Sequence, residues 1–228
     1  MKLYELCGAE PDRLFSAFSW RVRLLLGLKN LSFESAPTPF TQIKTDLAEI
    51  HPTVPVLVDG ETTLGDSFAI CQYVEQTYPD GPSLFGGEGG ISNAALIDSL
   101  IITGLHPSVT KMIIKDIHSQ LAPEDATYFR ESREKRLGAT LEDVQRGRNE
   151  VRAQFKALLK PYRRRLQAAA FLGGAAPLYS DIALASMVCW AKGTSAFDIW
   201  EGDPVFDDWF WRVMEICNQR GALKLVTA

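Results

Sequence analysis

The feature that most constrains the fold of this chain is a change of pattern near residue 90. Before it, the apolar residues alternate between strand and helix spacing every ten to fifteen positions, and after it almost every stretch has helical spacing. The segment PDGPSLFGGEGG at residues 79–90 is rich in turn formers and separates the two patterns. We therefore expect a mixed unit at residues 1–80, a linker at 81–91 and an all-helical unit at 92–228.

The order of elements predicts an α+β, two-domain architecture. The first unit reads βαβαββα, which is a βαβ motif followed by ββα around a mixed sheet. The second reads as a helical bundle, with its first helix bent at Pro107 because proline removes a helix hydrogen bond. The expected strands are residues 2–7, 31–36, 54–59 and 62–64, and the expected helices are 16–29, 67–78, 92–121, one opening at 123, 141–170, 178–191 and 204–218.

Composition excludes several classes of protein. The 24 Lys and Arg against 28 Asp and Glu give a net charge of −4, which argues against a nucleic-acid partner. No apolar run approaches the roughly 18 residues of a membrane helix. The first residues have the pattern of a strand, so we expect no secretory signal. The four cysteines and three histidines are scattered without metal-type spacing, so we expect no metal site, free thiols and a cytoplasmic location.

Three local signals could carry chemistry, and each also has a purely structural explanation. In the loop LFSAFSWR, Ser16 lies where a helix N-terminus could bind an anion, or it simply caps that helix. The Val54-Pro55 bond either opens an edge strand or is a cis peptide that turns the Val54 backbone toward a ligand. Asp66 and Ser67 cap the next helix, or they bind a zwitterion through its ammonium and carboxylate groups.

The order and spacing of these signals resemble the N-terminal domain of glutathione transferases. With the helical second half, the resemblance covers essentially the whole chain. Within that superfamily, the runs FSAFSWRV at 15–22, YPDGPSLF at 78–85, YFRESRE at 128–134 and TLEDV at 140–144 are similar to the β-etherase and etherase-related branch. The resemblance implies a thioredoxin-like domain followed by an all-helical domain, with glutathione as co-substrate.

The resemblance also implies roles for the loop residues. Ser16 falls where serine-type members keep the hydroxyl that hydrogen-bonds the glutathione sulfur, and Ser19 is a second candidate donor. Ala17 replaces a proline that usually follows that serine. Phe15 and His106 are expected in the pocket for the electrophile, whereas Phe18 is expected in the core.

For the rest of glutathione, the resemblance implies that the Val54 backbone pairs with the cysteinyl part beside a cis Pro55. Ser67 and Asp66 would then hold the γ-glutamyl end. Residues 1–90 contain six Lys and Arg against 12 Asp and Glu, so the field of this unit does not attract an anion. Local donors at these positions must hold the tripeptide instead.

The implied activity is attack of the glutathione thiolate on a hydrophobic, aromatic electrophile, with β-aryl ether cleavage as one form of it, in a homodimeric enzyme. Two alternatives stay open. The protein could bind glutathione and carry a hydrophobic ligand without catalysis, or it could be a thiol-disulfide transferase, which would need a reactive cysteine where this chain has Ser16 and Ser19. Ahead of Asp181, where relatives place a capping hydroxyl or amide, this chain has Leu178, which leaves the start of that helix less secure.

Overall fold

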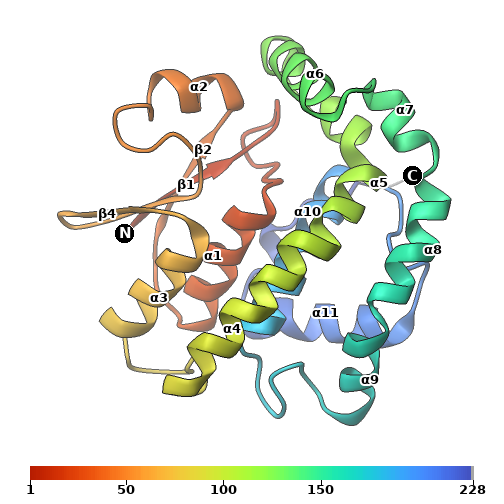
Figure 1. Cartoon of the computed structure of the whole chain (residues 1–228). Helices are drawn as coiled ribbons and strands as arrows, with labels where there is room; N and C mark the ends of the chain where they lie inside the picture. The colour runs from red at the N-terminus through yellow and green to blue at the C-terminus, as the bar shows by residue number, and fades with distance from the viewer. Residues whose placement is uncertain (227–228) are drawn as a thin grey trace.

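A computed structural model describes residues 1–226 of the chain (Figure 1). The first unit contains a four-stranded sheet in the order β2-β1-β3-β4, with β1 parallel to β2 and antiparallel to β3, and β3 antiparallel to β4. The predicted mixed sheet is therefore confirmed. Its elements are β1 (Lys2–Leu6), α1 (Ala17–Leu28), β2 (Glu34–Thr38), α2 (Phe40–Thr45), β3 (Val56–Asp59), β4 (Thr62–Gly65) and α3 (Ser67–Thr77).

The register of the sheet brings three segments that are distant in the sequence to one end of the sheet. Val56 lies opposite Tyr4 of β1 and opposite Gly65 of β4, and both pairs are antiparallel. The end of β1, the start of β3 and the end of β4 therefore share one end of the sheet. The loop after β1, the segment before β3 and the start of α3 consequently gather there.

The second strand lies later in the chain than the sequence pattern indicated. We expected residues 31–36, and β2 spans Glu34–Thr38. The chain leaves α1 through Asn30, whose φ of 52° makes a turn, before it becomes extended. Pro37 lies inside β2, which is possible because β2 is at the edge of the sheet and its missing N–H costs no ladder bond on the open side.

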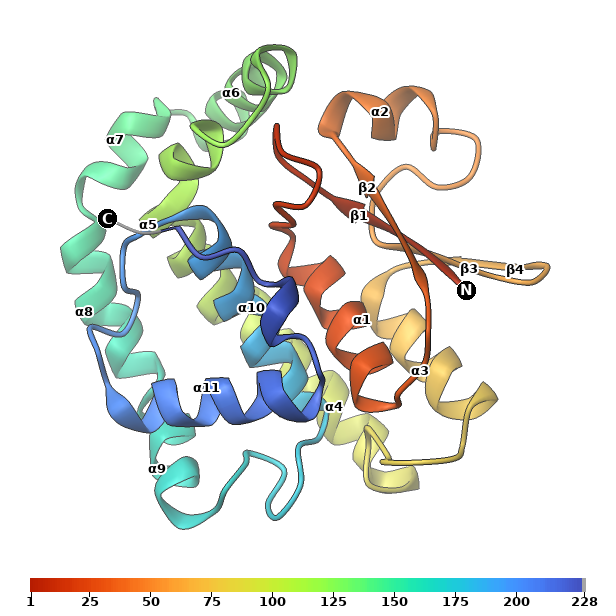
Figure 2. The same ribbon diagram turned by 180° about the vertical axis from the view of Figure 1, so that it is seen from behind.

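The second unit is helical, as predicted (Figure 2). The helix α10 is buried along almost its whole length, and it packs against α1, which joins the two units. The elements are α4 (Glu88–Leu100), the π-helical η1 (Ile101–Leu105), α5 (His106–His118), α6 (Pro123–Leu137), α7 (Leu141–Arg146), α8 (Arg148–Leu158), α9 (Lys160–Ala168), α10 (Tyr179–Thr194), α11 (Pro204–Ile216) and the 3₁₀ turn η2 (Arg220–Ala222).

Two predicted helices differ from those observed. The first is continuous through α4, η1 and α5, and the turns before Pro107 widen to a π-helix, which accommodates the missing N–H and the bulk of the proline ring. The second, expected as one helix over 141–170, is three. Gly147 separates α7 from α8, and Pro161 lies in the first turn of α9, where its missing N–H costs nothing.

The start of α10 is secured without a hydroxyl cap at Leu178. The Asp181 carboxylate, which is completely buried, accepts hydrogen bonds from the backbone N–H of Leu172 (2.7 Å), Gly173 (2.8 Å) and Leu178 (3.0 Å). It also accepts one from the indole of Trp209 at 2.8 Å. The lack of a capping hydroxyl at Leu178 is therefore compensated, because the Asp181 carboxylate binds both the loop before α10 and the facing helix α11.

Candidate functional site

Ser16 stands at the N-terminus of α1 with its hydroxyl available to a ligand. Its backbone is extended, and Oγ accepts a hydrogen bond from the N–H of Ser19 at 3.2 Å. The hydroxyl hydrogen of Ser16 is donated to no group among residues 1–226. The first N–H groups of a helix have no intrahelical partner, and they place a partial positive charge at the same point. This end of α1 therefore offers donors that suit an anionic atom.

Ser19, the second candidate donor, does not reach the same space. Its side chain is 0% exposed, and its Oγ has no hydrogen-bond partner in the described chain. It does not line the cavity next to Ser16. Of the two serines, only Ser16 faces a cavity.

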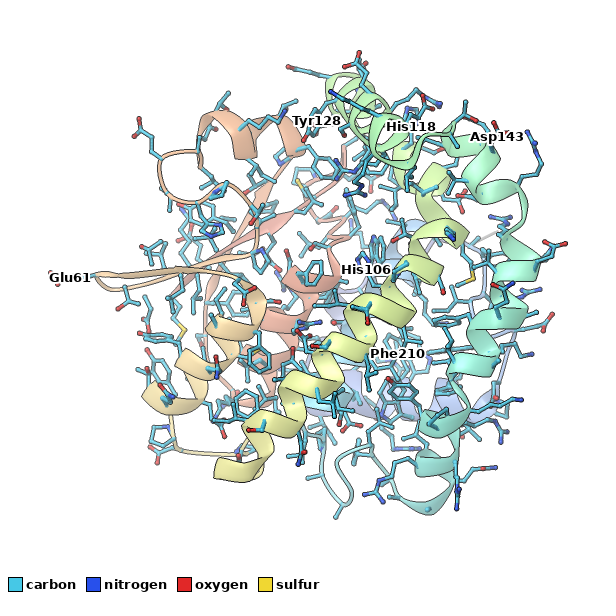
Figure 3. The ribbon with its side chains drawn as sticks, in the orientation of Figure 1. Glu61, His106, His118, Tyr128, Asp143 and Phe210 are labelled. Carbon is cyan, nitrogen blue, oxygen red and sulfur yellow. The ribbon has the colours of Figure 1, made fainter. Side chains whose placement is uncertain are left out.

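That cavity has a volume of about 220 Å³ and lies where the two units meet. Its walls come from β1, the start of α1, α2, α5, α6 and α10, and Figure 3 shows His106 on α5 beside this region. The wall is mostly apolar and aromatic. It is formed by Leu6, Phe15, Ser16, Ala17, Phe18, Phe40, His106, Thr110, Ile114, Ile117, Phe129, Arg133, Arg136 and Trp190.

An aromatic stack makes up one side of the cavity. The His106 ring lies between Phe18, at 5.4 Å between ring centroids, and Trp190, at 4.7 Å. Phe15 and His106 both line this cavity, and their place in a pocket for the electrophile stays a prediction. The assignment of Phe18 to the core was wrong, because the first turn of α1 faces α5 and the ring is only half-buried there. No local signal could have identified Trp190, which lies in a helix that is buried on nearly every side.

The imidazole of His106 is held neutral. Its burial, with smaller contributions from the charges of Arg21 and Arg136, lowers its pKa from 6.5 to about 4. Thr110 Oγ1 lies 3.5 Å from Nδ1. Near neutral pH this side chain is therefore an uncharged aromatic wall with a polar edge.

At the start of α3, Asp66 and Ser67 occupy the same end of the sheet as Ser16. Asp66 has a φ of 65°, and its Oδ1 accepts hydrogen bonds from the N–H of Phe68 (3.0 Å) and Ala69 (2.9 Å). Its carboxylate is exposed, so the second oxygen is open to solvent or to a ligand. Ser67 is 4% exposed and is the first residue of α3. Of the two residues, Asp66 caps α3 with its side chain, and this role is compatible with binding the ammonium group of a zwitterion.

Arg21 supports Ser67 from inside the molecule, a role that was not predicted from the sequence. Its side chain is 2% exposed, and Nη1 donates to Ser67 Oγ at 3.2 Å. Asp98 pairs with the guanidinium at 2.7 Å and accepts the hydroxyl of Tyr179 at 2.8 Å. The available signal was a pair of basic residues, Arg21 and Arg23, in a largely apolar stretch of α1.

The segment before β3 presents unpaired backbone at this end of the sheet. The Val54-Pro55 bond is cis, one of the two alternatives left open by the sequence. Among the described residues, neither the N–H nor the C=O of Val54 has a hydrogen-bond partner. His51, a further neighbour that the sequence did not indicate, packs against Gly65, where an added Cβ would lie 2.2 Å from Nε2. An extended peptide could therefore pair with Val54 here.

The four cysteines are all reduced and buried, and none lies at the start of α1. Burial raises the pKa of Cys7 to about 11 and that of Cys71 and Cys217 to about 12, and it also raises the pKa of Cys189. No thiolate nucleophile is therefore expected at neutral pH. Within residues 1–226, no three His, Cys, Asp or Glu side chains are grouped to hold a metal, and none of the helices there could span a bilayer.

Two family models match the chain. One, described as the glutathione S-transferase N-terminal domain, matches residues 11–83. The other, described as the glutathione S-transferase C-terminal domain, matches residues 94–219. Together they cover both units and place the site residues within the first model and the α5, α6 and α10 walls within the second.

The chain is also similar to several curated sequences over part of their length. Glutathione S-transferase Z1 of Arabidopsis thaliana is 33% identical over 131 residues, which is 53% of this chain and 58% of that protein. A probable maleylacetoacetate isomerase of Caenorhabditis elegans is 36% identical over 97 residues, which is 40% of this chain and 45% of that protein. The match thus spans about half of each relative.

Solved structures share the fold over the whole chain. Glutathione transferase GSTFuA3 of Phanerochaete chrysosporium superposes with a TM-score of 0.83 at 23% identity, covering 100% of this chain and 98% of that one. Glutathione S-transferase CsGST83044 of Ceriporiopsis subvermispora, solved in complex with glutathione, gives a TM-score of 0.81 at 22% identity, covering 96% and 98%. At such identities the likeness establishes the architecture of both units.

Proposed function

Because the chain belongs to the glutathione S-transferase family, we propose that it is a serine-type glutathione transferase that binds glutathione at the shared end of the sheet. The observation that carries this proposal is the convergence of three features. The open hydroxyl of Ser16, the unpaired backbone of Val54 and the start of α3 at Ser67 lie at one end of the sheet, and Ser16 also faces the aromatic cavity.

In this proposal the glutathione sulfur lies at Ser16, its cysteinyl backbone pairs with Val54, and its γ-glutamyl end meets Ser67 and Asp66. The Ser16 hydroxyl donates to the sulfur, and the N-terminus of α1 favours the thiolate over the thiol. The thiolate then attacks a carbon of an electrophile held against Phe15, Phe18 and Trp190. The Ser16 hydroxyl and the N-terminus of α1 are already in position before the reaction, so the protein needs little reorganisation to stabilise the thiolate.

Two outcomes of that attack fit the same site. In a displacement, the C–S bond forms and the leaving group departs with the bonding electrons, and β-aryl ether cleavage is a case in which an aryloxide leaves. In an isomerisation, the thiolate adds to one carbon of a double bond, the resulting single bond rotates, and elimination returns glutathione. The similarity to relatives named zeta-class transferases and maleylacetoacetate isomerases favours including this second outcome.

The proposal extends to a homodimer. Three large apolar side chains within α4 and η1 are exposed, namely Leu96 (60%), Leu100 (50%) and Ile102 (38%). Covering such a stretch by a second copy would remove it from water. A molar mass near twice 25.3 kDa in size-exclusion chromatography with light scattering would support the dimer, and a mass near 25.3 kDa would contradict it.

The activity is tested by conjugation of glutathione to 1-chloro-2,4-dinitrobenzene, followed by absorbance. We expect turnover by the parent and a loss of kcat/KM of about tenfold to a hundredfold in Ser16→Ala, since a hydrogen bond to a charged atom contributes about 1.5–3 kcal/mol. The matched control is Ser99→Ala, which removes an exposed helical hydroxyl in α4. Glutathione binding without turnover by the parent would instead favour a ligand carrier.

A further inference from the structure

Two arginines on α6 line the cavity, and the proposed activation of glutathione makes no use of them. Arg133 and Arg136 are three positions apart and therefore share one face of that helix. Within the described chain, no carboxylate lies within 4.0 Å of either one. Their neighbour Arg130, by contrast, is paired with Glu134 at 2.7 Å and Glu142 at 2.9 Å.

The guanidinium of Arg133 is fixed in place by aromatic rings. It lies 5.0 Å from the ring centroid of Phe40 and 4.7 Å from that of Phe129, and Nη1 donates to Ser132 Oγ at 2.9 Å. The helix α6 lies next to α2, and Figure 3 shows Tyr128 on the side of α6 toward α2. Stacking on rings does not use the N–H groups of the guanidinium, which point outward in its plane and can donate to a ligand.

The charge of the cavity wall is positive and uncompensated. None of the 14 lining residues is acidic, and His106 is neutral near pH 7 because its pKa is about 4. Burial, with a smaller contribution from the charge of Arg136, lowers the pKa of Arg133. An arginine nonetheless stays protonated at neutral pH, so the two positive charges repel each other unless an anion lies between them.

We propose that the electrophile of this enzyme carries a carboxylate, which Arg133 and Arg136 bind while the aromatic stack of Phe18, His106 and Trp190 holds its apolar part. This inference rests on the proposed transferase function and names its class of substrate. A guanidinium matches a carboxylate through two parallel N–H donors, which fixes orientation as well as position. The carboxylate then sets which carbon of the electrophile is presented to the thiolate at Ser16.

The test uses two electrophiles that differ only in charge, 4-chloro-3-nitrobenzoate and 4-chloro-3-nitrobenzamide. In each, the glutathione sulfur forms a bond to C4, the C–Cl bond breaks, and chloride leaves with the bonding electrons. The measured quantity is kcat/KM for each compound divided by its uncatalysed rate constant with glutathione. This normalisation removes the difference in intrinsic reactivity.

We expect the parent to prefer the benzoate by tenfold or more on this normalised scale. Arg133→Gln and Arg136→Gln should each reduce the preference about fivefold or more, and Arg133→Lys should reduce it less, because the charge remains while the fork is lost. The matched control is Lys135→Gln, which removes an exposed positive charge from the same helix outside the cavity wall and should leave the preference unchanged.

Calorimetric titration of the same two compounds into protein saturated with S-methylglutathione measures the discrimination without turnover. Failure of the transferase proposal would appear as absence of turnover with both compounds, while tighter binding of the benzoate, lost in the arginine variants, would still support the inference. A parent that does not discriminate between the two compounds overturns it. So does a rise in the KM for glutathione with unchanged discrimination, which would assign the arginines to a carboxylate of glutathione.

Discussion

Arg21 donates a hydrogen bond from Nη1 to the hydroxyl of Ser67 over 3.2 Å, joining the middle of α1 to the first residue of α3. The same guanidinium pairs with Asp98 of α4, so three helices from both units meet at one buried charge. The proposed binding end for the γ-glutamyl group is therefore supported from within the core.

Removing that charge should be costly for stability. Arg21→Met leaves Asp98 without its partner in a nearly enclosed place, and breaking one side of a buried ion pair costs about 3–5 kcal/mol. Urea denaturation followed by tryptophan fluorescence measures the loss. As a control, Arg146→Met breaks an exposed pair with Asp143 and should change the free energy of unfolding by less than about 1 kcal/mol. Equal effects of the two variants would contradict this role for Arg21.

Ser67→Ala should act on glutathione binding more than on the chemical step. The proposed contact is with the γ-glutamyl end, far along the tripeptide from the sulfur, so we expect the KM for glutathione to rise about tenfold with kcat nearly unchanged. Steady-state kinetics at varied glutathione concentration give the two parameters separately. A fall in kcat with constant KM would place Ser67 near the reacting atoms instead.

His106 should make the protein sensitive to acid. Its pKa is about 4 in the folded protein and about 6.5 when unfolded, so the unfolded chain binds the extra proton between these values. The effect of His106 on the free energy of unfolding is therefore absent above about pH 6.5. As the pH drops toward 4, protonation of the unfolded chain lowers that free energy by at most about 3 kcal/mol. His106→Phe keeps a ring against Phe18 and Trp190 and removes this loss. Urea denaturation at pH 7 and pH 4.5 should show a smaller decrease for the variant, and equal decreases would refute the assignment.

The thiols should be unreactive in the folded protein. All four are buried with raised pKa values, so we expect no reaction with 5,5′-dithiobis(2-nitrobenzoate) within minutes under native conditions and reaction of all four in denaturant. Conjugating activity should survive prolonged exposure to iodoacetamide. Rapid modification of one thiol with loss of activity would instead support the alternative that the protein is a thiol-disulfide transferase.

The parts of the fold and site that depend on neighbouring residues in the sequence could be predicted. Ser16 and Asp66 were recognisable as helix caps, and the order of strands and helices along the first unit followed from the spacing of apolar runs. The boundary of β2 and the breaks in the helices after residue 141 were missed, since an edge strand tolerates Pro37 and a single glycine can end a helix. In those places tertiary context outweighs periodicity.

The second substrate's side of the cavity could not be predicted from sequence. Phe18, His106 and Trp190 come from α1, α5 and α10, and their stack depends on how these helices pack. Arg133 lies in a run of charged residues that looks like any solvated helix face. Its position on the cavity follows only from the approach of α6 to α2 and to Phe40.

In the proposed function, Ser16 and the N-terminus of α1 ionise the thiol of bound glutathione. The most direct measurement is the ultraviolet absorbance of the thiolate, titrated with pH for glutathione bound to the parent and to Ser16→Ala, with Ser99→Ala as the control. We expect a thiol pKa at least about one unit below the ordinary value near 8.5 in the parent and in the control, and a return toward that value in Ser16→Ala. An equal pKa in the parent and Ser16→Ala would contradict it.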